Sequence, residues 1–232
     1  ERIASSYTQL SNKTMDLFKL FTKEVPKGFT LSEIVDRLAS MLNYNLTVMV
    51  GPKSSKLKVR DPTVYRFDPK KTLMALVEIY CNLANESKFV EAVARDGRSF
   101  DANVFSTATN ILSTRTTISP VTLEKFRDFA GEAVKQKQLD DEEELELGEV
   151  PDEFLDPLMF TIMENPVILP SSKLSIDMST IKTHLLSDPT DPFNRVPLKI
   201  EDVIEDVELK RKITDFKETR KLLFISKTKE KK

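Results

Sequence analysis

Cysteine, tryptophan and glycine are scarce in this sequence, whose 232 residues include one cysteine, no tryptophan and five glycines. The single cysteine, Cys81, cannot form a disulfide within the chain, which fits a reducing compartment. No apolar run reaches the roughly 18 residues typical of a membrane-spanning helix, so we expect no membrane contact. No signal peptide is visible, and the chain begins at Glu1 rather than at Met, so we expect a fragment of a longer protein.

An excess of basic charge is missing too, because the net charge is −2. Proteins that bind nucleic acid usually carry a basic excess or stripe, so we expect no nucleic-acid partner. The charge is uneven, however: residues 140–149 hold seven acids and no base, and residues 226–232 hold four lysines and one acid. Runs of like charge are typical of solvated segments. We therefore expect an acidic linker over 140–150 and a disordered basic tail over 226–232.

Residues 1–139 carry apolar side chains at helical spacing, as in 31–42, 73–84 and 123–133. The low glycine content and the many Leu, Lys, Glu and Ala residues also favour helix. Three prolines and many polar residues predict a loop over 51–69. The pattern predicts stacked helices, and it is compatible with a helical solenoid whose repeats are too degenerate to show a fixed period.

Residues 151–225 have a different composition, with seven of the twelve prolines. Short apolar runs at 167–169 and 174–176 predict two paired strands. Ser179 is placed to cap a following helix, a turn-rich loop follows over 188–198, and a final helix is predicted over 207–223. This order of elements predicts a compact α+β module.

A domain this small is marginal if only its apolar core stabilises it, and such domains commonly add disulfides or a structural metal. Zinc sites need about four Cys or His ligands, but residues 151–232 contain one histidine, His184, and no cysteine. We therefore expect no metal and instead a buried polar network. The candidate members are short polar or acidic residues of the predicted loops, for which ordinary turn residues are the alternative: Ser171, Ser172, Asp177, Asp191, Asn194, Glu201 and Asp202.

Four blocks in order now suggest a family: FLDPLMFTIMENPVILPSS (154–172), IDMSTIKTHL (176–185), DPTDPFNRVPL (188–198) and ELKRKITDF (208–216). Together they resemble the U-box, a RING-like domain in which salt bridges and hydrogen bonds replace the zinc ions. The amino-acid sequence of the blocks is most similar to that of the ubiquitin conjugation (chain-elongation) factor family.

The segment FVEAVARDGRSFDANVF (89–105) resembles the end of the long helical core of that family. The resemblance implies a mainly α protein. Residues 1–139 are then the C-terminal end of an armadillo-like helical core, and residues 151–225 are a small α+β U-box domain. Within the implied polar network, the members that we expect are Ser172, Asp177, Asp191, Asn194 and Glu201.

Two positions depart from the family pattern, which commonly has Asp at Asn165 and Arg at Met178. The missing arginine removes a possible salt-bridge partner from the internal network. We expect an effect on the network and on stability, but no effect on the docking surface.

The resemblance places the surface that docks a conjugating enzyme on two loops and the helix between them. Leu158 is expected as the exposed apolar anchor of the first loop, with Phe160 at its flank; the alternative is that both lie in the core. Pro192 and Phe193 of the second loop are expected to complete the groove, against the alternative of a plain turn.

Arg195 is the expected catalytic contributor, because in related domains a residue here bridges the conjugating enzyme and its ubiquitin. The rigid fork of arginine suits two acceptors at once, although a solvated loop arginine is the alternative. His184 is a candidate for docking, but a satisfied, partly buried histidine is favoured over a catalytic base. Cys81 lies on a helical stripe without activating neighbours, so we expect it to pack rather than to form a thioester.

The resemblance thus implies a RING-type ubiquitin ligase that forms no covalent intermediate, needs no cofactor and extends ubiquitin chains for protein degradation. The implied partners are a ubiquitin-charged conjugating enzyme, ubiquitin, the AAA segregase ATPase and ubiquitin-like-domain shuttle factors, the last through a missing N-terminal part. The implied location is the cytoplasm and the nucleus. The alternatives are a degenerate U-box adaptor without activity and another class of U-box ligase, although the latter carry repeats of a period not seen here.

Overall fold

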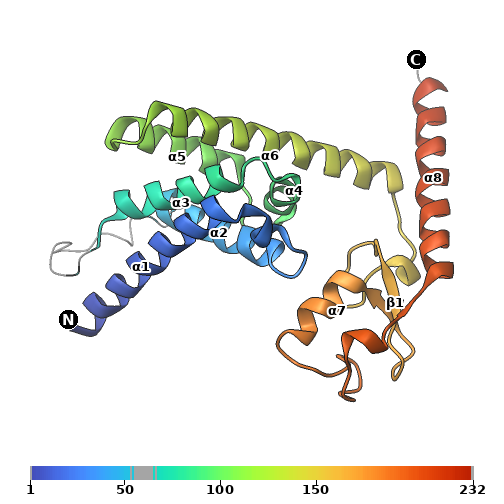
Figure 1. Cartoon of the computed structure of the whole chain (residues 1–232). Coiled ribbons are helices and arrows are strands. Elements are labelled where there is room, and N and C mark those ends of the chain that lie inside the picture. The colour runs from blue at the N-terminus through green and yellow to red at the C-terminus, as the bar shows by residue number, and fades with distance from the viewer. Residues whose placement is uncertain (1, 53, 55–64, 66, 231–232) are drawn as a thin grey trace. The chain divides into compact units, whose positions relative to one another are not determined.

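The computed structural model describes residues 2–52, 54, 65 and 67–230, and it divides the chain into two units, Glu1–Leu139 and Asp140–Lys232 (Figure 1). Most of the loop predicted over 51–69 lies outside the described residues. The mainly α architecture with a small α+β unit is confirmed, whereas an armadillo-like repeat in the first unit stays a prediction. Within the described part of the chain, no helix has the length and apolar character that would let it cross a bilayer.

The first unit is built from helices. They are α1 (Arg2–Glu24), the short 3-10 helix η1 (Pro26–Thr30), α2 (Val35–Val50), α3 (Pro69–Leu83), α4 (Ser87–Arg95), α5 (Ala102–Arg115) and α6 (Pro120–Leu147). Local sequence explains where α3 starts, because Asp68 accepts the N–H groups of Lys70 and Lys71 and Pro69 occupies the first turn.

An aromatic cluster fills the centre of the first unit. Tyr80 of α3 is fully buried, with its ring centroid 5.4–5.9 Å from those of Phe89, Phe105, Phe126 and Phe129. Its hydroxyl donates to Oδ1 of Asn43 on α2 at 2.8 Å, and the Asn43 amide donates to the carbonyl of Val93 at 3.1 Å. The polar tip of the ring is therefore satisfied inside an apolar core.

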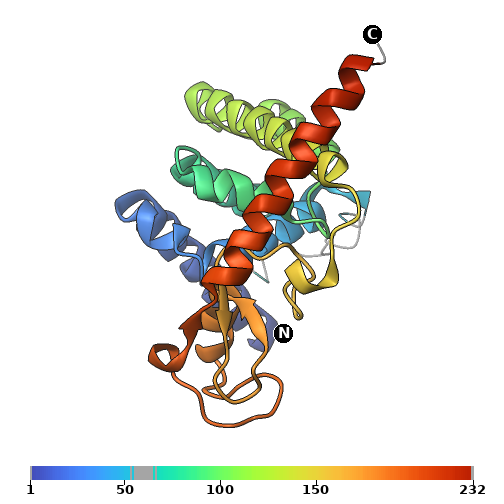
Figure 2. The same ribbon diagram turned by 90° about the vertical axis from the view of Figure 1, so that its right-hand side faces the viewer.

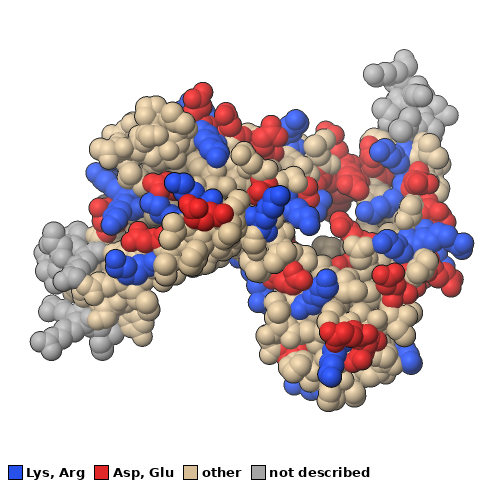
Figure 3. All heavy atoms as spheres, in the orientation of Figure 1, with Lys and Arg blue, Asp and Glu red and all other residues tan. Residues whose placement is uncertain are grey.

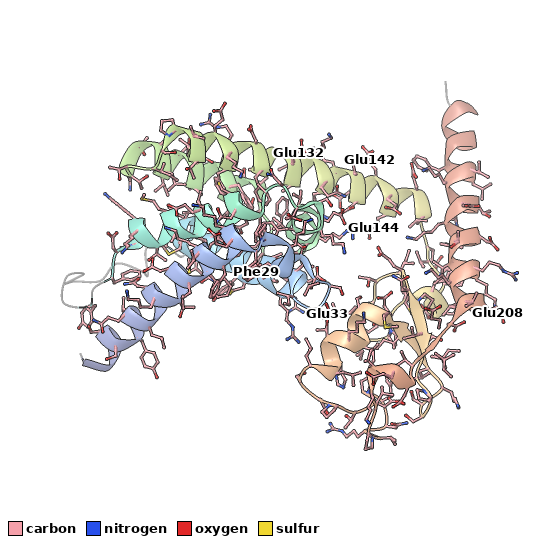
Figure 4. All side chains as sticks on the ribbon, viewed as in Figure 1. Phe29, Glu33, Glu132, Glu142, Glu144 and Glu208 are labelled. Atoms are coloured by element: carbon pink, nitrogen blue, oxygen red, sulfur yellow. The ribbon has the colours of Figure 1, made fainter. Side chains whose placement is uncertain are left out.

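The acidic segment is helical as far as Leu147, which the run of like charge did not predict, whereas its role as a linker over 140–150 stays a prediction. α6 continues to Leu147, and Glu142 and Glu144 project from this part of it (Figure 4). Glutamate and leucine are good helix formers, and Lys217 lies 3.9 Å from Glu143, which offsets part of the repulsion among the acids. Gly148, at φ +61°, then ends the helix in the left-handed conformation that glycine tolerates.

A three-stranded antiparallel sheet organises the second unit, in the order β2-β1-β3. The strands are β1 (Pro166–Ile168), β2 (Ser175–Asp177) and β3 (Ile204–Glu205). β1 pairs with β2, as predicted within one residue, and with β3, which the sequence did not reveal. Helix α7 (Met178–Leu185) follows β2 directly, and two 3-10 turns, η3 (Asp152–Phe154) and η4 (Ile200–Asp202), complete the unit.

The long helix α8 (Val207–Glu230) begins beside the sheet (Figure 2). Its first turns contribute Leu209 and Ile213 to an apolar cluster with Phe154 and Met163. The prediction of a disordered tail over 226–232 is wrong as far as Glu230, because α8 includes these residues; lysine and glutamate are good helix formers. Residues 231–232 lie outside the described part.

A second cluster lies under the sheet, between β1, β2 and α7. Its buried members are Val167, Leu169, Ile176, Ile181 and Leu198. The two small clusters hold few residues each, so polar contacts have to contribute to the stability of this unit.

Candidate functional site

Two loops of the second unit have the same backbone structure. In the first loop (156–161), the N–H of Asp156 donates to the carbonyl of Thr161 at 2.7 Å, and the N–H of Phe160 donates back to the carbonyl of Asp156 at 2.8 Å. In the second loop (191–196), Asp191 and Val196 form the corresponding bond at 2.8 Å, and Arg195 donates to Asp191 at 2.8 Å. Both loops begin with Asp-Pro, and each is flanked by a β-bridge.

The fifth residue of each loop has a left-handed backbone. Phe160 has φ 57° and Arg195 has φ 61°. Residues other than glycine avoid this region, at a cost of roughly 1–2 kcal/mol. Such strain concentrates at functional sites, where the surrounding structure holds it in place. Lys173, in the turn between β1 and β2, has the same conformation at φ 61°, so exposure and side-chain chemistry, together with the backbone, make Phe160 and Arg195 the candidates for function.

The aspartate that begins each loop is fully buried and uses its two carboxylate oxygens differently. Oδ1 of Asp156 accepts the N–H groups of Leu158 and Met159 in its own loop, at 2.8 and 3.0 Å. Oδ2 accepts the N–H of Asp177 at 2.9 Å, from the end of β2. One oxygen closes the loop, and the other ties it to the sheet.

Asp191 repeats this arrangement in the second loop. Its Oδ1 accepts the N–H of Phe193 at 2.9 Å, and its Oδ2 accepts the Ser171 hydroxyl at 2.6 Å and the Ser172 N–H at 3.2 Å. Burial on its own raises the pKa of Asp191, but the hydrogen bonds from Ser171, Phe193 and Ser172 outweigh it and hold the pKa below its ordinary value. Asp191 is therefore a buried carboxylate stabilised in its charged form.

Two further aspartates also use one carboxylate oxygen for nearby donors and the other for donors from a more distant segment. Asp177 caps α7 by accepting the N–H and hydroxyl of Ser179 on Oδ1, and its Oδ2 accepts the N–H groups of Glu164 and Asn165 at 2.8 Å each. Asp206 begins α8 by accepting the N–H of Leu209, and its Oδ2 accepts the Ser175 hydroxyl at 2.8 Å. We call Asp156, Asp177, Asp191 and Asp206 the carboxylate brace.

The carboxylate brace differs in part from the network that the sequence predicts. Ser172 takes part through its backbone N–H, and Asn194 accepts the N–H of Val196 at 3.0 Å. The structure corrects one expected member: Glu201 is exposed, and its side chain makes no hydrogen bond to the described residues. Asp156 and Asp206 were missed, although the repeated Asp-Pro of the two loops is a signal that could have identified Asp156.

The two departures from the family pattern leave the carboxylate brace intact. Asp177 accepts hydrogen bonds on both carboxylate oxygens although Met178 replaces a possible salt-bridge partner. The Met178 side chain packs against the cluster under the sheet instead. Asn165 accepts the Lys210 ammonium at 2.8 Å through its side-chain oxygen. The expected gap in the network is therefore not seen.

The predicted docking residues of the first loop are exposed rather than buried in the core. The exposed fractions are 40% for Leu158 and 76% for Phe160. Met159, which the sequence analysis did not single out, lies between them and is 60% exposed. Three consecutive exposed apolar residues on a small unit indicate a surface that another protein covers.

The second loop presents a different chemistry. Pro192 and Phe193 are half-buried, and Phe193 packs against the cluster under the sheet. Arg195 is exposed, and its guanidinium has no hydrogen bond or ion pair with any residue that the structure describes. The first loop therefore offers apolar contact, and the second offers an unpaired cation.

His184 of α7 connects the helix to the second loop. It is half-buried, and its Nε2 lies 3.0 Å from the carbonyl of Thr190, the residue before the loop. With a carbonyl as the partner, the ring nitrogen is the donor. This hydrogen bond occupies the nitrogen in holding the loop, as expected for a satisfied histidine.

Cys81 of the first unit is unsuited to nucleophilic chemistry. Its buried thiol donates to the carbonyl of Thr122 at 3.4 Å. Burial raises the pKa of Cys81 to about 12, so almost no thiolate exists at neutral pH.

No metal cluster and no basic stripe accompany these loops. Within the described ranges, no three His, Cys, Asp or Glu side chains are grouped so that they could hold a metal ion. Acidic and basic side chains are interspersed over the visible face of the protein (Figure 3), which is the pattern of a mixed surface rather than of a phosphate-binding stripe.

Comparison with known proteins assigns both units. Residues 1–134 match the family model described as "Ubiquitin elongating factor core", and residues 150–222 match that of the U-box domain. The chain is 55% identical over 221 residues to E4 ubiquitin-protein ligase UFD2 of Saccharomyces cerevisiae and 50% identical over 221 residues to Ubiquitin conjugation factor E4 of Schizosaccharomyces pombe. It is 39% identical over 219 residues to Probable ubiquitin conjugation factor E4 of Arabidopsis thaliana.

These matches cover 95%, 95% and 93% of this chain but only 23%, 22% and 21% of the three relatives. The chain thus spans less than a quarter of the length of the curated relatives it matches.

Proposed function

This chain belongs to the ubiquitin elongating factor family, and we propose that its U-box domain binds a ubiquitin-charged conjugating enzyme and promotes transfer of ubiquitin to a substrate lysine or to another ubiquitin. The observation that carries the proposal is the pair of loops built alike, one with an exposed apolar tip and one with an unpaired arginine. The names of the relatives, which include an E4 ubiquitin-protein ligase, support the same activity.

The first loop provides the docking contact in this proposal. Leu158 and Phe160 are 40% and 76% exposed in the free protein, and burial of the exposed part of each against a partner contributes at most about 1.5–3 kcal/mol. Pro192 and the half-buried Phe193 extend the apolar surface from the second loop. A few apolar anchors of this kind commonly dominate the free energy of binding at a protein interface.

Arg195 contributes to the reaction itself. Its guanidinium donates to carbonyl groups of the conjugating enzyme and of ubiquitin, which orders a thioester that otherwise moves freely. The lysine amine then attacks the thioester carbonyl, an amide bond forms, and the conjugating enzyme's cysteine leaves as a thiolate while the amine proton passes to solvent. The U-box acts by holding the reactants and forms no bond with ubiquitin.

The chemistry of the remaining candidates supports a mechanism without a covalent intermediate. The buried thiol of Cys81, with its pKa raised to about 12, is a poor nucleophile at neutral pH. The ring nitrogen of His184 is committed to the carbonyl of Thr190. Neither residue is needed for the transfer that we propose.

The proposal extends to the setting of the activity, on the strength of the family resemblance. We place the protein in polyubiquitin chain elongation for degradation, in the cytoplasm and the nucleus. Its further partners are the AAA segregase ATPase and ubiquitin-like-domain shuttle factors. Co-purification of each of these partners with this chain tests this part separately.

Discharge of a ubiquitin-loaded conjugating enzyme onto free lysine tests the central proposal. We expect the chain to accelerate discharge, Leu158→Ala to abolish the acceleration, and Arg195→Ala to lower it strongly to a residual rate that can still be measured, while the thermal unfolding of the U-box stays unchanged. A folded wild-type chain that binds conjugating enzymes but accelerates none of them would instead indicate an adaptor with a degenerate U-box.

A further inference from the structure

Asp191 connects Arg195 to a distant part of the U-box domain. The Asp191 carboxylate is fully buried, and its Oδ2 accepts the Ser171 hydroxyl at 2.6 Å and the Ser172 N–H at 3.2 Å, both from the turn between β1 and β2. Its backbone carbonyl accepts the N–H of Arg195 at 2.8 Å. One residue thus links the β1–β2 turn to the backbone that carries the arginine.

The direction of the Arg195 side chain depends on this backbone. Within the described ranges, no hydrogen bond or ion pair fixes the direction of the guanidinium. The residue is held at φ 61°, a conformation that an arginine avoids unless its surroundings impose it. The backbone bonds between Asp191 and Val196 and from Arg195 to Asp191 close this turn, and the Asp191 carboxylate holds the turn in place through Phe193, Ser171 and Ser172.

We propose that Asp191 is a positioning residue for Arg195, holding the left-handed turn from which the guanidinium reaches the conjugating enzyme and its ubiquitin. This inference rests on the proposed function. It assigns binding of the conjugating enzyme to the first loop and promotion of ubiquitin transfer to the second loop. Asp156 holds Leu158 and Met159 by the corresponding bonds. A change at Asp156 therefore weakens binding of the conjugating enzyme, whereas a change at Asp191 slows transfer from the bound complex.

Asp206 offers a matched control, because it makes the same kind of bonds away from both loops. Its Oδ1 accepts the N–H of Leu209 at 3.0 Å, and its Oδ2 accepts the hydroxyl of Ser175 at 2.8 Å. Asp206→Asn and Asp191→Asn keep the shape of the side chain and replace one acceptor oxygen with a donor. Both are expected to lower stability, but only Asp191→Asn is expected to disturb Arg195.

The experiment measures lysine discharge under single-turnover conditions with Asp191→Asn, Arg195→Ala and the double variant, together with the affinity for the charged conjugating enzyme. We expect Asp191→Asn to lower the rate at saturation by roughly tenfold, since a displacement of about 1 Å at a positioning contact costs up to about 100-fold. Its affinity is expected to stay within about twofold of the wild type. In the Arg195→Ala background it is expected to cause no further loss, because coupled residues are not additive.

Three results would overturn the inference. They are additive losses in the double variant, an equal loss of rate in folded Asp206→Asn, and a loss in Asp191→Asn that appears only as weaker binding. If Asp191→Asn fails to fold, Ser171→Ala serves instead, since it removes one donor to Oδ2 and is expected to slow saturated discharge without changing affinity. A wild-type chain without any acceleration refutes the proposed function first, and this inference with it.

Discussion

Asp156 accepts the backbone N–H of Asp177 at 2.9 Å, which places two buried carboxylates in series. Asp177 in turn accepts the N–H groups of Glu164 and Asn165 just before β1. The first loop, the edge of the sheet and the start of α7 are therefore joined by side-chain oxygens and backbone N–H groups. Because these donors are partly or fully removed from water, each depends on its aspartate.

We expect Asp177→Ala to unfold the U-box domain while the helical unit stays folded. The substitution leaves several donors without a partner, each costing about 1–3 kcal/mol, in a domain whose core supplies only about 3–5 kcal/mol. Thermal unfolding followed by circular dichroism is expected to lose one transition and keep the other. Glu201→Ala is the control, because Glu201 is exposed and outside the network; an Asp177→Ala protein with both transitions unchanged contradicts the role of the carboxylate brace.

Phe160→Gly is expected to stabilise the domain and to weaken docking at the same time. Glycine relieves the left-handed strain at φ 57°, and after its larger entropy in the unfolded chain is subtracted the gain is about 0.5–1 kcal/mol. Phe160→Ala keeps the strain and loses the same ring, so it is expected to weaken docking without a gain in stability. Denaturant unfolding and binding of a conjugating enzyme, measured on both variants, separate the two effects; equal stability of the two variants would count against strain.

Acid is expected to destabilise the U-box domain through Asp191. Its hydrogen bonds hold the folded-state pKa below the ordinary value of 3.8. This contribution is therefore fully present above the ordinary pKa and is lost as the pH falls through the lower, folded-state pKa. Urea unfolding between about pH 5 and pH 2 measures how steeply the free energy of unfolding depends on pH. Asp191→Asn is expected to be less stable at neutral pH and to show a shallower slope, and an unchanged slope would argue against this assignment.

Tyr80→Phe is expected to destabilise only the helical unit. It leaves Oδ1 of buried Asn43 without its donor at a cost of about 1–3 kcal/mol. The U-box transition and lysine discharge are expected to stay at wild-type values. Tyr44→Phe provides the control, since Tyr44 is 62% exposed and should leave both transitions in place. Equal shifts from the two tyrosines would contradict a special role of the Tyr80 hydroxyl.

Cys81 is expected to resist thiol reagents at neutral pH until the helical unit unfolds. Its pKa is raised to about 12, first by burial, so that the reactive thiolate is rare and also covered. Labelling monitored by mass spectrometry, with and without denaturant, checks this. We also expect Cys81→Ala to keep the discharge activity, and a ubiquitin thioester on Cys81 in a non-reducing gel would refute the mechanism without a covalent intermediate.

Local patterns allowed the sequence to predict much of this fold. Apolar stripes identified the helices, and the lack of Cys and His ligands in 151–232 pointed to a polar network that includes Asp177 and Asp191. The helical conformation of the acidic end of α6 was not predicted, because a run of like charge is typical of a solvated segment and the place of Lys217 beside Glu143 depends on tertiary structure.

Other features of the site gave no local signal. β3 has two residues and no apolar alternation of its own. Asp156 stands in an otherwise apolar stretch, DPLMF, which the sequence analysis treated only as a contact surface. Its structural role became evident from hydrogen bonds to residues far along the chain, as did the likeness between the two loops. Met159 was missed because exposure cannot be read from residue type alone.

The carboxylate brace also determines which chemical conditions leave the U-box domain folded. A module held by thiolates and zinc fails when the metal is chelated or the sulfur is oxidised. Here the bracing atoms are carboxylate oxygens and amide hydrogens, and residues 151–232 contain no thiol at all. The backbone of the two loops should therefore be insensitive to zinc chelation and to thiol oxidation.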